Sequence, residues 1–167
     1  MKPSLVPISK SFQKASFDCG YPVLNEYFRL YALKNDRMSI GKTFVAVDKD
    51  EGVVGYMTLA SAQVEARSLP EEKRAKLPRY PIPAFRIVRL AVDARFQGSG
   101  AGSWLLRQAL ERAISVSAEV GLYAVIVDAI DEKAKRFYLK YGFEAFAEYP
   151  LTLFLPLTTI ARALSGE

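Results

Sequence analysis

The sequence concentrates glycine in one short segment, Gln97–Ser103 (QGSGAGS). The surrounding residue pattern predicts that this segment joins a strand to a long helix. Glycines leave backbone N–H groups uncovered, and the first N–H groups of a helix have no partner inside the helix. Because the positive end of the helix dipole adds to these donors, such a loop binds an anion, for example a pyrophosphate.

The residues alone leave three interpretations of this loop open. A Walker A loop needs GxxxxGK followed by Ser or Thr, and that pair is missing here. A dinucleotide fingerprint GxGxxG fits Gly98 and Gly100 but has Ser103 at the third glycine position. The segment Asp93–Gln97, which separates the predicted strand from the first glycine, further weakens the dinucleotide interpretation. Asp128 nevertheless lies where a ribose-binding acid is expected. The third interpretation is a flexible turn that binds nothing.

The inventory of reactive side chains excludes several kinds of chemistry. The 167 residues contain no histidine and one cysteine, Cys19. These counts exclude Ser-His-Asp and Cys-His catalysis, histidine-based zinc sites, an internal disulfide and a CxxC pair. Cys19 without a base is more typical of a small core residue than of an acyl-carrying nucleophile. We therefore expect a cytoplasmic protein whose chemistry needs no metal.

Charge and hydropathy narrow the class of partner. The chain has 23 Lys and Arg against 18 Asp and Glu, a net charge of +5. This excess favours a polyanionic partner such as RNA, DNA, anionic lipid or a nucleotide, or it serves solubility alone. The sequence predicts no leader peptide. The apolar stretches Tyr123–Val127 and Leu153–Leu157 are too short for a membrane helix.

The first half predicts a helix and a hairpin that precede the glycine loop. Apolar residues at helical spacing favour a helix over Asp18–Asn35. Two β-branched runs, Thr43–Val47 and Val53–Ala60, predict strands joined by a turn at Asp48–Gly52. The proline-marked stretch Arg67–Pro83 predicts an irregular loop with a short helix near 70–75.

The second half predicts alternating strands and helices around the glycine loop. We expect Gly121 and Gly142 to end the two helices. The elements, in order, are a strand Phe85–Val92, a helix from about 101 to 120, a strand Leu122–Asp128 buried on both faces, a helix Glu132–Tyr141, and strands Phe143–Phe146 and Leu151–Leu157. The pattern predicts one α/β domain over residues 1–167, with a mixed sheet covered by helices.

Two motifs resemble a known enzyme family. Gln97-x-x-Gly100-x-Gly102 is similar to the Q/R-x-x-G-x-G/A pattern of the GNAT family of acyl-CoA N-acyltransferases. Arg89–Val92 (RLAV) resembles the family's fourth strand, and Ala134–Phe143 (AKRFYLKYGF) resembles its A-x-x-F-Y-x-x-x-G-F signature. The resemblance covers residues 43–157. It implies the GNAT fold, a central mixed and mostly antiparallel sheet flanked by helices.

The resemblance also implies a set of site residues. Acetyl-CoA is the expected acetyl donor, with its pyrophosphate on the loop amides and its pantetheine arm on the strand edge. One departure is Asp131, where many GNAT enzymes carry Asn. The residues implied to contact acetyl-CoA are Leu90, Ala91, Val92, Gln97, Gly98, Ser99, Gly100, Ala101, Gly102, Ser103, Asp131, Phe137 and Tyr141.

Further segments resemble the GNAT toxins of bacterial toxin–antitoxin pairs. The resemblance implies acetylation of the free α-amino group of aminoacyl-tRNA, which blocks translation. It implies a ribbon-helix-helix antitoxin, contact with operator DNA through that antitoxin only, and a homodimer. Arg89, on the strand that ends near the acetyl group, is the expected substrate contact. The matching segments are FDCG (17–20), Asn25, YALKN (31–35), TFV (43–45), VGY (54–56), PIP (81–83), RLAVD (89–93) and YPLTLF (149–154).

The residue types bear on the acceptor and on the catalytic acid. An α-amino group with a pKa near 7.8 is about a tenth neutral at pH 7, whereas a lysine amine is almost wholly charged. A site without histidine therefore suits an α-amine, with Glu65, Asp93 or water as a base. The Tyr138 phenol is our candidate acid for the leaving thiolate. The competing interpretation places Tyr138 in the core among its aromatic neighbours.

Two other functions remain compatible with the sequence. One is a GNAT enzyme that acts on a polyamine or a protein amine. The other is a regulatory subunit that keeps the fold and binds DNA or a partner. Basic residues that could face RNA are Lys34, Arg37, Lys42, Arg86, Arg89, Lys135, Arg136 and Lys140.

Overall fold

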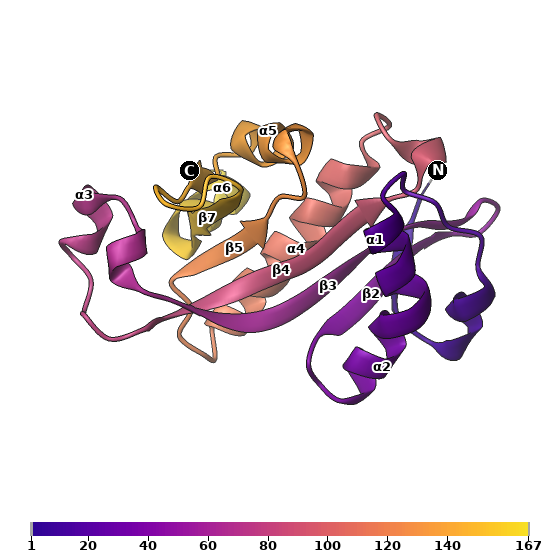
Figure 1. Ribbon diagram of the computed structural model, residues 1–167, viewed down its shortest axis with the longest axis horizontal. Coiled ribbons are helices and arrows are strands. Elements are labelled where there is room, and N and C mark those ends of the chain that lie inside the picture. The colour runs from indigo at the N-terminus through magenta and orange to yellow at the C-terminus, as the bar shows by residue number, and fades with distance from the viewer. Residues whose placement is uncertain (1, 167) are drawn as a thin grey trace. The chain divides into compact units, whose positions relative to one another are not determined.

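The computed structural model describes residues 2–166 and contains a seven-stranded sheet, in the order β1-β2-β3-β4-β5-β7-β6 (Figure 1). The β4–β5 pair is parallel, whereas the β1–β2, β2–β3, β5–β7 and β6–β7 pairs are antiparallel. The predicted mixed, mostly antiparallel sheet is thereby confirmed. The strands are β1 Ser4–Pro7, β2 Lys42–Asp48, β3 Gly52–Val64, β4 Ile82–Val92, β5 Ala124–Asp128, β6 Glu144–Ala145 and β7 Thr152–Pro156.

Helical segments separate most of these strands. The run that follows the N-terminal segment changes from α-helix to one π-helical turn and back within a few residues. The helices are η1 Lys10–Lys14, α1 Pro22–Glu26, the π-helix η2 Tyr27–Tyr31, α2 Ala32–Arg37, η3 Ala66–Ser68, α3 Glu71–Arg74, η4 Ala94–Phe96, α4 Ala101–Ser117, α5 Glu132–Lys140 and α6 Leu157–Ser165. Within residues 2–166, no helix has the length and apolarity needed to cross a bilayer.

The chain forms two compact units. One unit comprises the residues up to Ala60 together with Val88–Ala109, and the other comprises Ser61–Ile87 together with the residues from Leu110 on. Strands β3 and β4 and helix α4 each contribute residues to both units.

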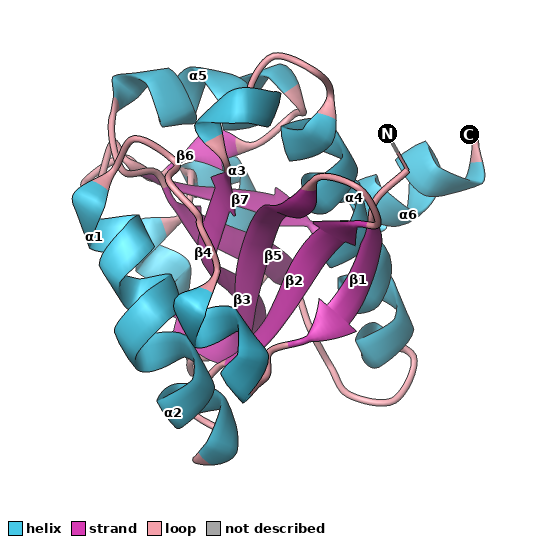
Figure 2. Cartoon of the chain, turned by 90° about the vertical axis from the view of Figure 1, so that its right-hand side faces the viewer, coloured by secondary structure: helices cyan, strands magenta, loops and turns pink. Residues whose placement is uncertain are grey.

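In the first unit, the α1–η2–α2 run packs on the sheet formed by β1, β2 and β3 (Figure 2). Leu24, Phe28 and Ala32 recur at helical spacing and share one buried cluster with strand residues such as Val45 and Tyr56. The ring of Phe28 stacks on that of Tyr56, with centroids 4.9 Å apart. The Tyr56 hydroxyl is buried and donates to the Leu24 carbonyl at 2.7 Å, so its one polar atom is satisfied.

The next residue along β3 faces the opposite side of the sheet. Successive side chains of a strand alternate, so Gly55 points away from the helices that cover Tyr56. A Cβ at Gly55 would lie 2.5 Å from the Ala91 carbonyl oxygen and 2.9 Å from Leu105 Cδ1. The glycine therefore allows β4 and the start of α4 to approach β3 closely.

In the second unit, the core forms where β5 lies between β4 and β7. Ala124, Ile126 and Phe154 are almost fully buried, together with Phe146, whose ring stacks on Phe154 at 5.3 Å. Residues 124–127 of β5 are all buried, as expected for a strand covered on both faces. Leu69 anchors the loop between β3 and β4 in the same cluster.

Most predicted elements are confirmed with small shifts of their ends, but some predictions were wrong. Gly142 has φ +93° and ends α5 as expected. Gly121, by contrast, does not end α4, which stops at Ser117, and its φ is not positive. The helix expected from Asp18 begins at Pro22, because residues 18–20 form a turn of side-chain hydrogen bonds. Strand β1 and helix α6 were not predicted from the sequence.

The close approach at Gly55 predicts a stability effect. Gly55→Ala should lower the free energy of unfolding by about 1–3 kcal/mol, because the new methyl meets a backbone carbonyl that has little freedom to move. Denaturant titration measures this change. Gly121→Ala is the control, since a Cβ there has no neighbour within 4 Å. Equal midpoints for the two variants would contradict the packing described.

Candidate functional site

The glycine loop lies between the short helix η4 and the long helix α4, so the predicted loop before a long helix is confirmed. Gly98 and Gly100 have φ values of +81° and +94°, in the left-handed region that favours glycine. Helix α4 begins directly after them at Ala101, and its first N–H groups lack partners within the helix. A Cβ on either glycine would have no neighbour within 4 Å, so the space beside the loop is open. The loop can therefore receive a bulky anion.

The side chain of Gln97 is directed into the protein. Its Nε2 donates to the carbonyl oxygens of Cys19 and Val92, both at 2.9 Å. These bonds tie the first residue of the loop to the end of β4 and to the N-terminal segment. We had expected Gln97 to contact acetyl-CoA. These two bonds assign its Nε2 to holding the loop, and the expected contact of Gln97 with acetyl-CoA stays a prediction.

Asp93 fixes the turn that leads into the loop. Its carboxylate is buried and accepts from the Arg95 N–H and Arg95 Nε, both at 3.0 Å, and from the Asp18 N–H at 3.2 Å. Burial alone would raise the pKa of Asp93, but the hydrogen bonds and the Arg95 charge outweigh it and lower that pKa. A carboxylate so satisfied is a weak base. The earlier suggestion that Asp93 is a general base therefore has no support from the structure.

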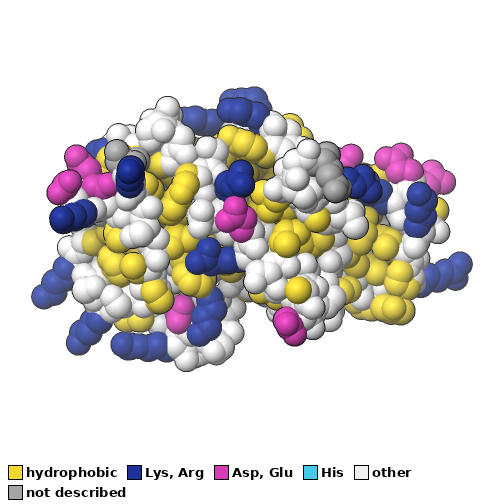
Figure 3. Space-filling view, turned by 180° about the vertical axis from the view of Figure 1, so that it is seen from behind, with side chains coloured by type: hydrophobic (Ala, Val, Ile, Leu, Met, Phe, Trp, Pro, Cys, Tyr) yellow, Lys and Arg dark blue, Asp and Glu magenta, His cyan; other side chains and the backbone are white. Residues whose placement is uncertain are grey.

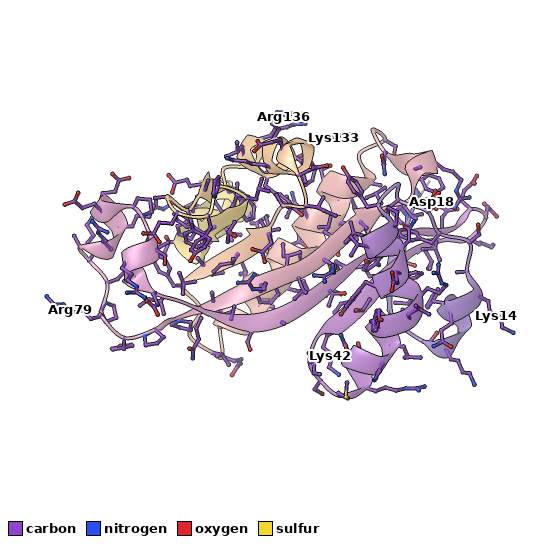
Figure 4. The ribbon with its side chains drawn as sticks, viewed as in Figure 1. Lys14, Asp18, Lys42, Arg79, Lys133 and Arg136 are labelled. Atoms are coloured by element: carbon purple, nitrogen blue, oxygen red, sulfur yellow. The ribbon has the colours of Figure 1, made fainter. Side chains whose placement is uncertain are left out.

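The FDCG segment forms the other side of this network (Figure 4). Asp18 Oδ1 accepts from the Gly20 N–H and from Asn25 Nδ2, both at 2.9 Å, and these bonds lower the Asp18 pKa. The Cys19 N–H donates to Asn25 Oδ1. Burial raises the pKa of the Cys19 thiol, which keeps it protonated and unreactive. The segment acts as a structural brace for the loop, a role that sequence reasoning missed.

The end of β4 places the remaining loop-side residues. Ala91 and Val92 are buried and Leu90 is half-buried, so these three offer mainly backbone groups to a ligand. Arg89 is half-buried, and its Cζ lies 4.8 Å from the centre of the Tyr27 ring. Arg89 thus has a fixed position in the same unit as the loop.

In the second unit, α5 presents Tyr138. Asp131 caps this helix by accepting from the Ala134 N–H at 2.8 Å. Tyr138 is 5% exposed, and its ring meets Phe143 edge-on at 5.5 Å. The Tyr138 hydroxyl forms no hydrogen bond within residues 2–166. No fully buried side-chain oxygen in this part of the chain lacks a partner, so the Tyr138 hydroxyl retains a small solvent exposure. Burial raises the Tyr138 pKa, and the phenol, which is protonated at neutral pH even with its ordinary pKa, stays so in the fold.

The structure thus brings the predicted residues together in two groups. Arg89–Ser103 lie in the first unit, and Asp131, Phe137, Tyr138 and Tyr141 lie in the second. The Phe137 and Tyr141 rings are neighbours at 5.2 Å. No group of three or more potential metal-ligating side chains occurs within the part of the chain that the structure describes.

The predicted RNA-facing cations differ in how far they are engaged. Lys42 pairs with Asp36 at 3.5 Å, and Arg86 pairs with Asp128. Arg136 points outward from α5 beside Lys133 (Figure 4). On the face seen in Figure 3, Lys and Arg side chains are spread between apolar areas rather than gathered in one patch. Charge alone therefore does not mark an RNA site on that face.

Comparison with known proteins gives a consistent result. Residues 39–145 match the model of the acetyltransferase (GNAT) domain. A protein of Mycobacterium tuberculosis described as a tRNA-acetylating toxin is 39% identical over 160 residues, which is 96% of this chain and 95% of that protein. A probable toxin TacT of Sinorhizobium fredii is 30% identical, over 92% of this chain and 89% of its own length.

Solved structures share the fold over nearly the full chain. A tyrosine-to-phenylalanine variant of KacT has a TM-score of 0.90 at 29% identity and covers 98% of this chain and 99% of its own. AtaT complexed with acetyl-methionyl-tRNAfMet has a TM-score of 0.86 at 28% identity, with the same coverage. Other similar structures are AtaTR bound with AcCoA, AtaT bound to the C-terminus of the antitoxin AtaR, and a KacTA–DNA complex.

The Asp93 network predicts a pH dependence of stability. Because folding lowers the Asp93 pKa, its contribution is fully present above the ordinary aspartate pKa of about 3.9 and is lost as pH falls below it. Asp93→Asn should lower the free energy of unfolding at pH 7 by about 1–3 kcal/mol and flatten the loss of stability in acid. Urea titrations from pH 7 to pH 3 measure both effects. Asp50→Asn, in the exposed hairpin turn, is the control, and an unchanged acid slope in Asp93→Asn would refute the assignment.

Proposed function

This chain belongs to the GNAT family of acetyltransferases, and from that premise we propose that it transfers acetyl from acetyl-CoA to the α-amino group of aminoacyl-tRNA and so acts as a toxin that blocks translation. The observation that carries the proposal is the near full-length similarity to a tRNA-acetylating toxin. The fold of AtaT, solved with an acetylated aminoacyl-tRNA, supports the same substrate class.

The geometry of the loop fits an acetyl-CoA donor. Gly98 and Gly100 leave open space beside the N–H groups at the start of α4, where the pyrophosphate would lie. Binding through backbone groups needs a loop of fixed shape, and Gln97 and Asp93 provide the bonds that hold it. We assign Leu90, Ala91 and Val92 to the pantetheine arm through their backbone.

The transfer needs a neutral amine and a proton for the leaving group. The amine nitrogen bonds to the acetyl carbonyl carbon, the C–S bond breaks, and the sulfur leaves with the bonding electrons. We assign to Tyr138 the donation of a proton to that thiolate, because its phenol is protonated at neutral pH and its hydroxyl has no hydrogen-bond partner among residues 2–166. An α-amino group with a pKa near 7.8 is partly neutral before the attack, as the transfer requires. After the attack the nitrogen passes its surplus proton to water, and the Tyr138 phenolate regains a proton from solvent.

The partners follow the same similarity. Related toxins occur with an antitoxin C-terminus and in an antitoxin–DNA complex, so an antitoxin protein is the expected inhibitor of this chain. We propose that this antitoxin is of the ribbon-helix-helix type, that operator DNA is contacted through it, and that the toxin is a cytoplasmic homodimer.

The loop assignment predicts loss of donor binding in one variant. Gly100→Glu should abolish acetyl-CoA binding, because a bulky anionic side chain would fill the open space and repel the pyrophosphate. Gly52→Glu is the matched control, since Gly52 also has a positive φ and no Cβ neighbour within 4 Å but lies at the first residue of β3. Both changes carry a backbone cost of about 1–2 kcal/mol. Calorimetry that finds acetyl-CoA bound equally well by the two variants would overturn the assignment.

The acid assignment predicts a loss of rate without a loss of fold. Tyr138→Phe keeps the buried ring and removes only the hydroxyl, so turnover of aminoacyl-tRNA should fall by about 10²–10⁴ while acetyl-CoA affinity is kept. Transfer of labelled acetyl from acetyl-CoA to charged tRNA measures the rate. Tyr149→Phe, at an exposed position, is the control. Normal turnover by Tyr138→Phe would show that Tyr138 packs in the core and is not the catalytic acid.

The same variant connects chemistry to toxicity. Expression of the unchanged chain should arrest growth, and expression of Tyr138→Phe should not, at equal amounts of folded protein. Co-expression of the antitoxin should restore the growth of cells that express the unchanged chain. If the purified chain acetylates polyamines or proteins but leaves charged tRNA unmodified, the toxin proposal is wrong.

A further inference from the structure

Arg89 is a half-buried cation without a carboxylate partner. Within residues 2–166 it forms no ion pair, and its one hydrogen bond runs from Nη1 to the adjacent Val88 carbonyl at 2.9 Å. Partial burial of an uncompensated charge costs free energy, so an arrangement of this kind indicates an anion that arrives from outside. A guanidinium has five N–H donors, and most of those of Arg89 remain available.

The Tyr27 ring sets the position of this guanidinium. Arg89 Cζ lies 4.8 Å from the ring centre, within the range of a cation–π contact. Tyr27 is itself held, because its ring is nearly parallel to that of buried Tyr56 at 6.4 Å and its hydroxyl accepts from Asn35 Nδ2 at 3.4 Å. The Arg89 side chain therefore rests on a rigid aromatic surface and needs little ordering when it binds a ligand.

A second aromatic ring lies next to Tyr27 within one π-helical turn. Residues Tyr27–Tyr31 form one turn in which the Ala32 N–H bonds to the Tyr27 carbonyl. Such turns are rare inside α-helices and are frequent at functional sites. The Tyr27 and Tyr31 ring centres lie 6.5 Å apart within this turn. Tyr31 remains 46% exposed, so part of an aromatic ring next to Tyr27 is available to a ligand.

We propose that Arg89, Tyr27 and Tyr31 form a subsite for the 3′-terminal nucleotides of the RNA substrate. Arg89 binds a backbone phosphate, Tyr31 stacks on an unpaired base, and Tyr27 is a positioning residue that holds Arg89. This inference rests on the proposed function, since it assumes that aminoacyl-tRNA is the acceptor. A guanidinium with free donors suits a phosphate, and an exposed ring suits a single-stranded base.

Acetyl-CoA also carries phosphates, so the test must separate the two sources. The RNA subsite predicts that Arg89→Gln raises the KM for aminoacyl-tRNA by about ten- to a hundredfold, because a charge-assisted bond to phosphate is lost. The KM for acetyl-CoA should stay unchanged. Arg89→Lys should recover part of the loss, since it keeps the charge without the planar fork. Arg162→Gln on α6 is the control for removal of one cation.

Two further measurements report on the phosphate itself. Arg89→Gln should lower the slope of log KM against log salt by about one, which a purely structural change would not do. Acetylation of a phosphate-free aminoacyl methyl ester should proceed at the same rate in Arg89→Gln and in the unchanged protein. Equal losses with the ester and with charged tRNA, an unchanged salt slope, or a raised KM for acetyl-CoA would each overturn the subsite.

The positioning role of Tyr27 has its own test. Tyr27→Phe keeps the ring and should leave the KM for aminoacyl-tRNA nearly unchanged, whereas Tyr27→Leu should raise it towards that of Arg89→Gln with kcat at saturation preserved. Tyr31→Leu should raise KM by a smaller factor through loss of stacking. If Tyr27→Leu is too unstable to purify, the comparison of Tyr31→Leu with Tyr31→Phe decides, and equal KM values for those two would refute the stacking role.

These outcomes remain distinguishable from failure of the proposed function. If the unchanged protein does not acetylate charged tRNA at all, the proposed function is wrong and the subsite is overturned with it. If the unchanged protein is active and the Arg89 and Tyr31 variants keep its KM and salt slope, the subsite alone is wrong.

Discussion

The hydrogen bonds of two side chains fix the glycine loop, and the acetyl-CoA site proposed there depends on them. Gln97 donates to the carbonyl of Val92, five residues before it, and to that of distant Cys19, and Asp93 accepts from N–H groups of Arg95 and Asp18. Arg95 extends the network to the β2–β3 hairpin through the carbonyls of Glu51 and Val53. A loop with two glycines in left-handed conformations has little rigidity of its own, so these bonds from outside determine its shape.

The chain contains no histidine, and other groups provide the hydrogen-bond and proton donors. The loop offers backbone donors for an anion, and Tyr138 offers a phenol that is protonated at neutral pH. An α-amine has a lower pKa than a lysine amine, so a larger fraction of it is neutral at pH 7. Such an acceptor therefore does not need a histidine base in the protein. Catalysis of this kind relies on holding reactants in place more than on proton abstraction by a side chain.

Local signals in the sequence predicted the strand–loop–helix unit, because glycine spacing and apolar periodicity act over a few residues. The same signals identified Gly142 as a helix terminator but failed at Gly121, where the chain leaves α4 several residues earlier. Local sequence patterns did not predict the contacts between segments that are distant along the chain. Nothing near Gln97 indicates that its amide meets the Cys19 carbonyl, and nothing near Tyr27 indicates Arg89. The π-helical turn was read as ordinary helix, since a single inserted residue barely changes the periodicity.

A binding site made of backbone N–H groups has an uneven tolerance of sequence change. Every residue type except proline carries the same donor, so positions outside the core such as Ser99 and Ser103 can change over generations without loss of a ligand contact. Selection then falls on backbone shape, at Gly98 and Gly100, and on the braces that maintain it. Relatives of this protein should therefore differ freely in the small residues of the loop while keeping partners for Gln97 and Asp93.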